Sequence, residues 1–190
     1  FFLILIVFKI THSNTAVSGV VISFTIPAIF FGSLAGVFVD RWNKKYVLII
    51  TNVLRALLLI LLVFYLNNLF VIYLIAFIVS ILTQFFIPAE SPIIPHVVQK
   101  KHLLSANALF GIGIFGSMLV AFVLSGPVIL LFGEKQTLVL LAFILLVGAV
   151  FISFIQLHYQ KTVTANVLQK SRTIFHDMKH TLLHISQRKV

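Results

Sequence analysis

Apolar stretches long enough to cross a membrane recur along this chain, and a short polar segment ends each of them. An α-helix needs about 20 apolar residues to span the ~30 Å hydrocarbon core of a bilayer. Of the 190 residues, 61% are hydrophobic and 9% are charged, which leaves too few polar side chains to cover a water-soluble globule. The sequence therefore predicts an all-α membrane protein whose solvent is the lipid bilayer.

These stretches predict five full membrane spans and one partial span. The full spans are placed at residues 16–39, 46–66, 70–88, 104–131 and 137–157. Residues 1–8 are apolar from the first position, lack an initiating Met and follow no basic segment of the kind that a signal peptide carries. We interpret them as the end of a first helix whose beginning is missing.

The positive charges predict how the chain lies in the membrane. Its formal charge is +10, but the basic residues alternate with the spans and form no single patch, so we expect no nucleic-acid partner. One set of connections contains Arg41, Lys44, Lys45, Lys100 and Lys101, six more basic residues follow the last span, and the other set contains Lys9 and Lys135. Because cytoplasmic loops carry the excess of Lys and Arg, the second span is predicted to end in the cytosol.

Small residues mark two spans as those that approach other helices closely. They are Ala28, Gly32 and Gly36 in the second span and Gly113, Ser117, Ala121 and Ser125 in the fifth, each set at four-residue intervals. Membrane helices pack tightly where small residues let their backbones touch. Both spans are therefore predicted to lie at a helix–helix interface.

An acid ends the second span, in the segment GSLAGVFVDRWNKK at residues 32–45. Asp40 lies at the carboxyl end of its helix, where the helix dipole is already negative, so a cation or the amino end of another helix should face it. Either a gating partner from elsewhere supplies this, or Asp40 is a stray acid among ordinary positive-inside residues. The segment resembles the loop signature of the major facilitator superfamily, and the resemblance assigns a cytosolic lock to Gly36, Asp40, Arg41, Lys44 and Lys45.

The resemblance implies the N-terminal six-helix bundle of a twelve-helix major facilitator fold, with its first helix truncated. Residues 1–158 then form the transmembrane bundle, and residues 159–190 form a cytosolic amphipathic linker that leads towards a missing C-terminal half. In this tail His176, His180 and His184 recur every four residues, a spacing that could bind a metal ion. A polar helix face is the interpretation we favour, and we predict no metal site and no cofactor.

Two further segments resemble the macrolide-efflux and siderophore-exporter branch of this superfamily. They are DRWNKK with the following NVLRALLL, and FFIPAESPIIPHVVQKKHLLSANAL at residues 85–109. In that branch an acid precedes the arginine of the third helix by three residues, and here Asn52 precedes Arg55. Arg55 is expected ~13 Å into its span, where a permanent cation must snorkel, pair or line a wet cavity. Asn52 can accept a hydrogen bond from it, and structural anchoring and a substrate or gating role both stay open.

Glu90 stands at the predicted cytosolic mouth of the fourth span. It is expected either to take part in the cytosolic lock or to remain solvated. Its candidate partners are Lys100, Lys101 and the loop after the second span.

Features associated with proton antiport are incomplete in this sequence. The resemblance places Val79 where many proton-coupled exporters carry an arginine. Gly126 and Pro127 resemble the helix-bending pair of antiporters, but the glycine expected four residues before the pair is Phe122. The pair marks either an antiporter motif or a simple kink.

The polar side chains inside the fourth span admit two interpretations. With their aromatic neighbours they form the set Tyr73, Phe77, Ser80, Thr83 and Gln84. The set could line a mostly apolar pocket for a hydrophobic compound. The alternative, which we favour, is that these residues bridge helices.

We therefore expect a secondary active transporter that exports small amphipathic molecules or drugs by proton antiport and alternating access. An uncoupled facilitator, an importer of the same superfamily and a structural membrane protein are the alternatives. We expect no enzyme, because the paired carboxylates, Ser–His arrangement or metal ligands of an active site do not converge at one depth. The expected location is the plasma (inner) membrane of a bacterium, with the tail in the cytosol.

Overall fold

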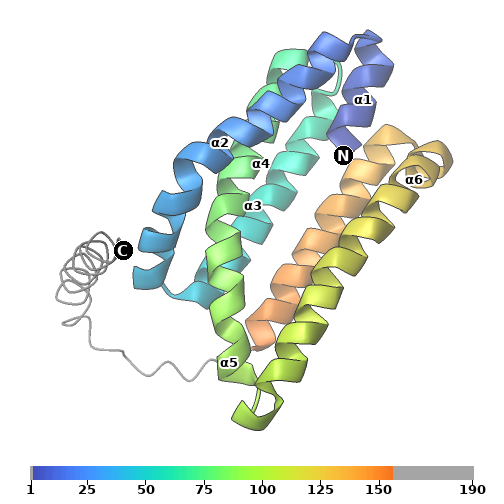
Figure 1. Ribbon diagram of the computed structural model, residues 1–190. Coiled ribbons are helices and arrows are strands. Elements are labelled where there is room, and N and C mark those ends of the chain that lie inside the picture. Colours follow the sequence, from blue (N-terminus) through green and yellow to red (C-terminus); the bar gives the residue numbers. More distant parts are fainter. Residues whose placement is uncertain (1, 156–190) are drawn as a thin grey trace, which may run out of the picture. The chain divides into compact units, whose positions relative to one another are not determined.

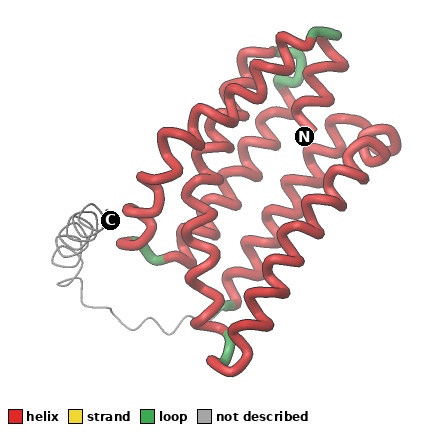
Figure 2. The backbone as a smooth tube through the Cα atoms, in the orientation of Figure 1, coloured by secondary structure: helices red, strands yellow, loops and turns green. Residues whose placement is uncertain are grey.

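The structure, a computed structural model, describes residues 2–155, and within them the chain is helical and forms no strand (Figures 1 and 2). The α-helices are α1 (Phe2–Thr11), α2 (Asn14–Arg41), α3 (Lys44–Phe64), α4 (Leu69–Glu90), α5 (Ile94–Val97) and α6 (Leu103–Phe154). Two short 3-10 helices, η1 (Ser91–Ile93) and η2 (Lys100–His102), flank α5. The predicted all-α class is confirmed, whereas the predicted linker at 159–190 and its three histidines lie outside the described residues.

Helix α6 is a hairpin of two arms. Its 52 residues contain one non-helical position, Gly133, with φ 78° and ψ 171°. In Figure 1 the chain runs along the yellow-green arm, reverses, and returns along the orange arm. The predicted fifth and sixth spans, at residues 104–131 and 137–157, are these two arms as far as Phe154.

The other full spans agree with the observed helices to within about two residues, whereas the partial span predicted at residues 1–8 continues as α1 to Thr11. Their ends follow from local chemistry, because short polar side chains cap the helices at the turns. Ser13 Oγ accepts a hydrogen bond from the amide of Ala16, and Asn68 Oδ1 accepts from the amide of Val71. In the described residues, four continuous helical stretches are long and apolar enough to cross a membrane: Asn14–Gly32, Lys44–Phe64, Leu69–Ile93 and Lys100–Phe154.

Two clusters of buried apolar residues hold the helices together. Helix α2 packs on α4, and α3 packs on both α4 and α6. The larger cluster joins α1 to the neighbouring ends of α2, α3, α4 and the returning arm of α6: Leu3, Ile6, Val7, Val20, Leu62, Leu66, Ile72, Ile75, Ala76 and Leu138. The smaller cluster lies near the α2–α3 loop: Val39, Val47, Leu48, Ala89 and Ile93.

The first arm of α6 is the least covered part of the bundle. From Leu103 to Phe132 no residue is buried by other described residues. Large apolar side chains such as Phe115 and Leu119 are 70% and 67% exposed. In lipid such exposure is not costly, because lipid tails are as apolar as leucine.

Candidate functional site

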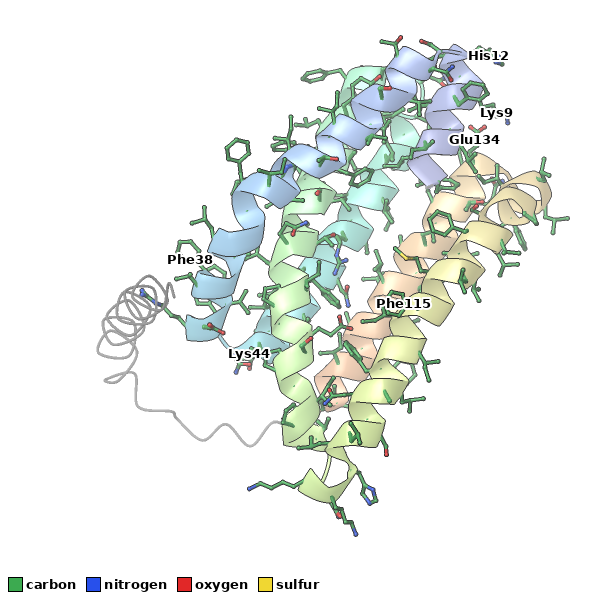
Figure 3. All side chains as sticks on the ribbon, in the orientation of Figure 1. Lys9, His12, Phe38, Lys44, Phe115 and Glu134 are labelled. Atoms are coloured by element: carbon green, nitrogen blue, oxygen red, sulfur yellow. The ribbon has the colours of Figure 1, made fainter. Side chains whose placement is uncertain are left out.

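The end of α2 presents an acid and a base at the end of the bundle opposite to Lys9 and Glu134, as the labels of Phe38 and Lys44 show in Figure 3. Asp40 and Arg41 form the last two positions of α2, and both are exposed. Within residues 2–155 the Asp40 carboxylate accepts no hydrogen bond and makes no ion pair. Among the described residues, Asp40 is therefore flanked by basic residues but paired with none of them.

Aromatic stacking holds this loop against α4. The Trp42 ring stacks on the Phe85 ring of α4, with centroids 6.0 Å apart, and lies 5.9 Å from the ring of Phe38. The amide of Trp42 donates to Val39 O at 3.1 Å, which ends α2 tightly. Trp42 was not among the predicted site residues, although a single tryptophan in a polar loop is a signal for such an anchor.

Lys45, also part of the predicted lock, contacts the end of another helix. Its Nζ donates to Ser153 O at 2.6 Å and to Ile155 O at 2.8 Å. These carbonyls belong to the last turn of α6 and to the residue that follows the helix. No feature of the sequence predicted this contact, because more than 100 residues separate the partners.

Arg55 of α3 is half-buried, and groups of α3 and α4 receive its guanidinium. Its Nη2 donates to Asn52 Oδ1 at 2.9 Å, which is the hydrogen bond that the sequence predicts, and its Nε donates to Thr51 O at 3.2 Å. Its Cζ lies 4.5 Å from the centre of the Phe86 ring of α4. A cation over an aromatic face is stabilised by the ring's quadrupole. The Phe86 ring thus covers one face of the guanidinium, whose N–H groups donate to Asn52 and Thr51.

Glu90 is the last residue of α4 and lies one helical turn beyond Phe86. It is half-buried, and its carboxylate interacts electrostatically with Arg55. Among the described residues no ion pair joins Glu90 to Lys100 or Lys101. The structure thus brings Glu90 into the neighbourhood of Arg55, a partner that the sequence analysis did not consider.

The polar side chains of α4 contact α2 or their own helix. Tyr73 Oη donates to Ala16 O at 2.9 Å, and Ser80 Oγ donates to Phe24 O at 2.7 Å. Thr83 Oγ1 donates to Val79 O within α4. For Tyr73 and Ser80 these contacts are the helix bridges of the interpretation that we favour, and the lining of a substrate pocket by this set stays a prediction.

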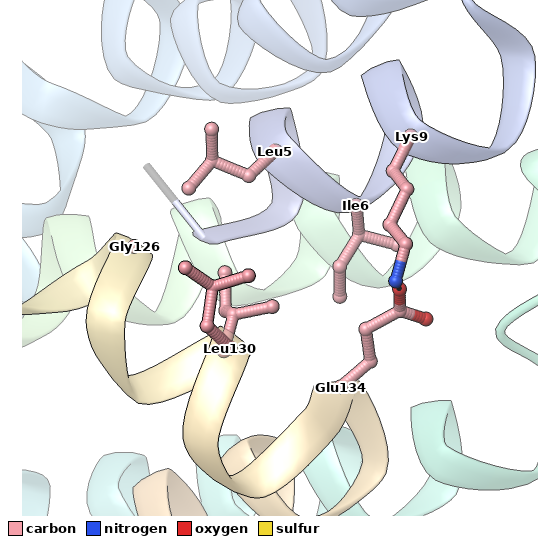
Figure 4. A pocket seen from close by; sticks show the side chains of 7 residues that line it. Leu5, Ile6, Lys9, Gly126, Leu130 and Glu134 are labelled. Carbon is pink, nitrogen blue, oxygen red and sulfur yellow. Dashed lines mark ion pairs between the residues drawn. The ribbon is translucent and has the colours of Figure 1, made fainter.

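At the opposite end a small cavity lies between α1 and the first arm of α6 (Figure 4). Its volume is about 190 Å³, and its lining residues are Leu5, Ile6, Lys9, Gly126, Ile129, Leu130 and Glu134. Lys9 Nζ and Glu134 Oε1 form an ion pair of 2.7 Å at its edge. Gly126 and Pro127 stay within the helix, and the strong backbone break comes later, at Gly133.

Metal chemistry finds no support in the described part of the chain. Residues 2–155 contain no group of three or more His, Cys, Asp or Glu side chains placed to hold an ion. The histidines of the tail lie outside this range.

Comparison with known proteins places the chain beside membrane transporters. The sequence profile of the Major Facilitator Superfamily matches residues 1–184. The protein named Uncharacterized MFS-type transporter YkuC, from Bacillus subtilis (strain 168), is 32% identical over 119 residues, which cover 56% of this chain and 28% of that protein. The protein named Uncharacterized MFS-type transporter YfiS, from the same organism, is 26% identical over 130 residues, which cover 63% of this chain and 31% of that protein. The matches therefore span less than a third of the length of these relatives, and no solved structure matches the chain.

Proposed function

Because the chain belongs to the major facilitator superfamily, we propose that the complete protein is a secondary active transporter that exports small amphipathic molecules in exchange for protons. It works by alternating access, in which two halves rock about a central site. The proposed substrates are hydrophobic or drug-like compounds, in line with the resemblance of residues 85–109 to the macrolide-efflux and siderophore-exporter branch.

The observation that carries this proposal is the unpaired carboxylate of Asp40. An acid at the carboxyl end of a helix is unfavourable without an opposing positive charge, and within residues 2–155 no cation forms an ion pair with Asp40. A partner on the other half of the protein explains why the acid stands there. Asp40 and Arg41 then form, with Gly36, Lys44 and Lys45, a lock that closes the cytosolic side when the protein faces outward.

The uncovered faces of α2 and of the first arm of α6 support a second half as the partner. A Cβ added at Gly36 or Gly113 would meet no described atom within 4 Å. Small residues with open space in front of them suit close contact with further membrane helices. The missing C-terminal half of the same chain is the proposed occupant.

The electrostatic interaction between Arg55 and Glu90, which form no ion pair in the described structure, supports proton coupling. A carboxylate beside a cation, both half-buried within a helix bundle, is a group whose protonation changes the local charge. Glu90 also remains a candidate member of the cytosolic lock. Val79, which stands where the resemblance expects a proton-relay arginine, favours the alternative of an uncoupled facilitator or an importer.

The proposed location is the inner membrane of a bacterium. The chain is an integral membrane protein by its family and its apolar helices. The excess of Lys and Arg in the loops that contain Arg41 and Lys100, and in the tail, supports a cytosolic position for these parts.

The test uses the full-length protein in inside-out membrane vesicles with an imposed proton gradient. A lipophilic cation such as ethidium is the probe, and a pH-sensitive dye reports the gradient. Export by antiport predicts uptake of ethidium into the vesicles with simultaneous loss of the gradient. Ethidium uptake that ignores the gradient would favour the facilitator, and no movement of ethidium or of a panel of amphipathic compounds in either direction would contradict the proposal.

A further inference from the structure

The cytosolic end of α6 requires partners for its carbonyl groups. The last four C=O groups of an α-helix accept no hydrogen bond from within the helix, and the helix dipole makes this end negative. In α6 the helix ends at Phe154, and Ile155 leaves it with an extended backbone, φ −68° and ψ 118°. Its amide still donates to Ile152 O at 3.1 Å, so this bond closes the final turn.

The positive charge of Lys45 is unfavourable for α3, but it can stabilise the carboxyl end of α6. It is the second residue of α3, and a cation in the first turn of a helix opposes the positive end of the helix dipole. Asn43 already caps α3, because its Oδ1 accepts from the amide of Lys45 at 3.1 Å. The ammonium group is therefore not needed for the start of α3, and it reaches Ser153 O and Ile155 O instead.

The same contact joins α6 to the loop that carries Asp40. Ile152 and Ile155 pack against the smaller buried cluster, which includes Val39 of α2 and Val47 of α3. Val39 is fully buried, and Asp40 follows it directly. A hydrogen-bonded cation and an apolar cluster thus connect the end of α6 with the end of α2.

We propose that Lys45 is a positioning residue that caps the carboxyl end of α6 and fastens it to the Asp40–Arg41 loop, so that these two segments open together. The site is a pair of helix-end carbonyls, and the ligand is the side-chain ammonium of the same chain. Lys45 then does not contact the other half directly. The proposal rests on the proposed function only for its effect on transport, because the capping itself is independent of what the protein carries.

Amide hydrogen exchange of the full-length protein in lipid nanodiscs tests the capping and the fastening. In Lys45→Met, which keeps the length of the side chain and removes the charge, the amides of residues 151–155 and of 39–43 should exchange about tenfold faster. This ratio corresponds to one hydrogen bond to a charged group. Lys45→Arg should restore slow exchange, since a guanidinium also donates to carbonyl oxygens. Lys101→Met is the matched control, because Lys101 is exposed on the same side of the bundle.

The results of the exchange and transport measurements test the capping, the fastening and the positioning role separately. Unchanged exchange at 151–155 in Lys45→Met would overturn the capping, and faster exchange there without a change at 39–43 would overturn the fastening. Faster exchange that also includes residues 58–62, at the far end of α3, would indicate general destabilisation and overturn a local role. In the transport assay Lys45→Met should lower the turnover rate and leave KM unchanged, and a wild-type turnover rate would overturn the positioning role. Absence of transport by the wild-type protein would contradict the proposed function, while the exchange result would still decide the capping and the fastening.

Discussion

Arg55 carries a permanent charge inside a membrane-spanning helix, and its surroundings explain how the bundle accommodates it. An arginine at the bilayer centre costs about 3 kcal/mol or more on insertion scales. Here Asn52, Thr51 O and the Phe86 ring receive the guanidinium, and Glu90 supplies an opposite charge nearby. The hydrogen bond to Asn52 was predictable, because residues one helical turn apart share a face. Phe86 and Glu90 were not, since the sequence does not say which face of α4 meets α3.

The interaction of Arg55 with Glu90 predicts non-additive effects on stability. Arg55→Met and Glu90→Gln should each leave one charge without its partner, whereas the double variant removes both. The coupling free energy of this double-mutant cycle should be about 0.5–3 kcal/mol, measured by unfolding the full-length protein in mixed micelles. The control cycle pairs Glu90→Gln with Lys101→Met and should show no coupling. Equal coupling free energies in both cycles would mean that Glu90 has no specific interaction with Arg55.

Gly19 of α2 packs against the Tyr73 ring of α4. A Cβ added there would lie 2.9 Å from Tyr73 Cζ and 3.1 Å from its Oη. Gly19→Ala should therefore displace the ring, break the hydrogen bond to Ala16 O and lower the free energy of unfolding by about 1–3 kcal/mol. Gly148→Ala is the control, because its Cβ would lie in ordinary contact, 3.6 Å from Asn52 Nδ2. If both variants unfold alike, close packing at Gly19 is not the cause.

At the scale of the elements, span length and helix-end chemistry made most of the architecture predictable. Apolar runs bounded by polar turns placed α2, α3 and α4 to within about two residues and the ends of α1 and α6 to within about three, because a bilayer fixes the length of a span. The predicted break between the fifth and sixth spans is present, but the residue that makes the turn, Gly133, was not identified. The residues next to Gly133 in the sequence do not show that the chain reverses there with a positive φ. That conformation depends on how the two arms of α6 pack.

The hairpin of α6 therefore predicts a specific sensitivity at Gly133. Its φ of 78° with ψ 171° lies in a region open essentially to glycine alone. Gly133→Ala should cost about 1–3 kcal/mol of stability, and the added Cβ would also lie 3.2 Å from Gln136 Oε1. Thermal unfolding of the full-length protein measures the loss, with Gly148→Ala again as the helical control. A melting temperature equal to that of the control would show that the arms can turn without a positive φ.

At the scale of the whole molecule, the matched part of the chain corresponds to less than a third of the related transporters. The family membership and the matching relatives, of which the chain covers less than a third, agree with a bundle that needs further helices. The extent of the second apolar span predicted that Asp40 lies at a helix end, whereas the sequence could not predict that Lys45 turns away to α6. Contacts between distant helices depend on their relative rotation, and periodicity along one helix does not fix that rotation.

The most direct test of the account is the effect of Asp40→Asn on which side of the membrane the central site faces. The reporter is Gln84→Cys in the full-length protein without other cysteines, labelled from the cytosolic side by a membrane-impermeant maleimide. If Asp40 locks the cytosolic side, its neutralisation should shift the population inward and raise the labelling rate by about 5–150-fold, while Asp40→Glu should stay near the rate of the reporter protein alone. An unchanged labelling rate in Asp40→Asn would contradict the lock.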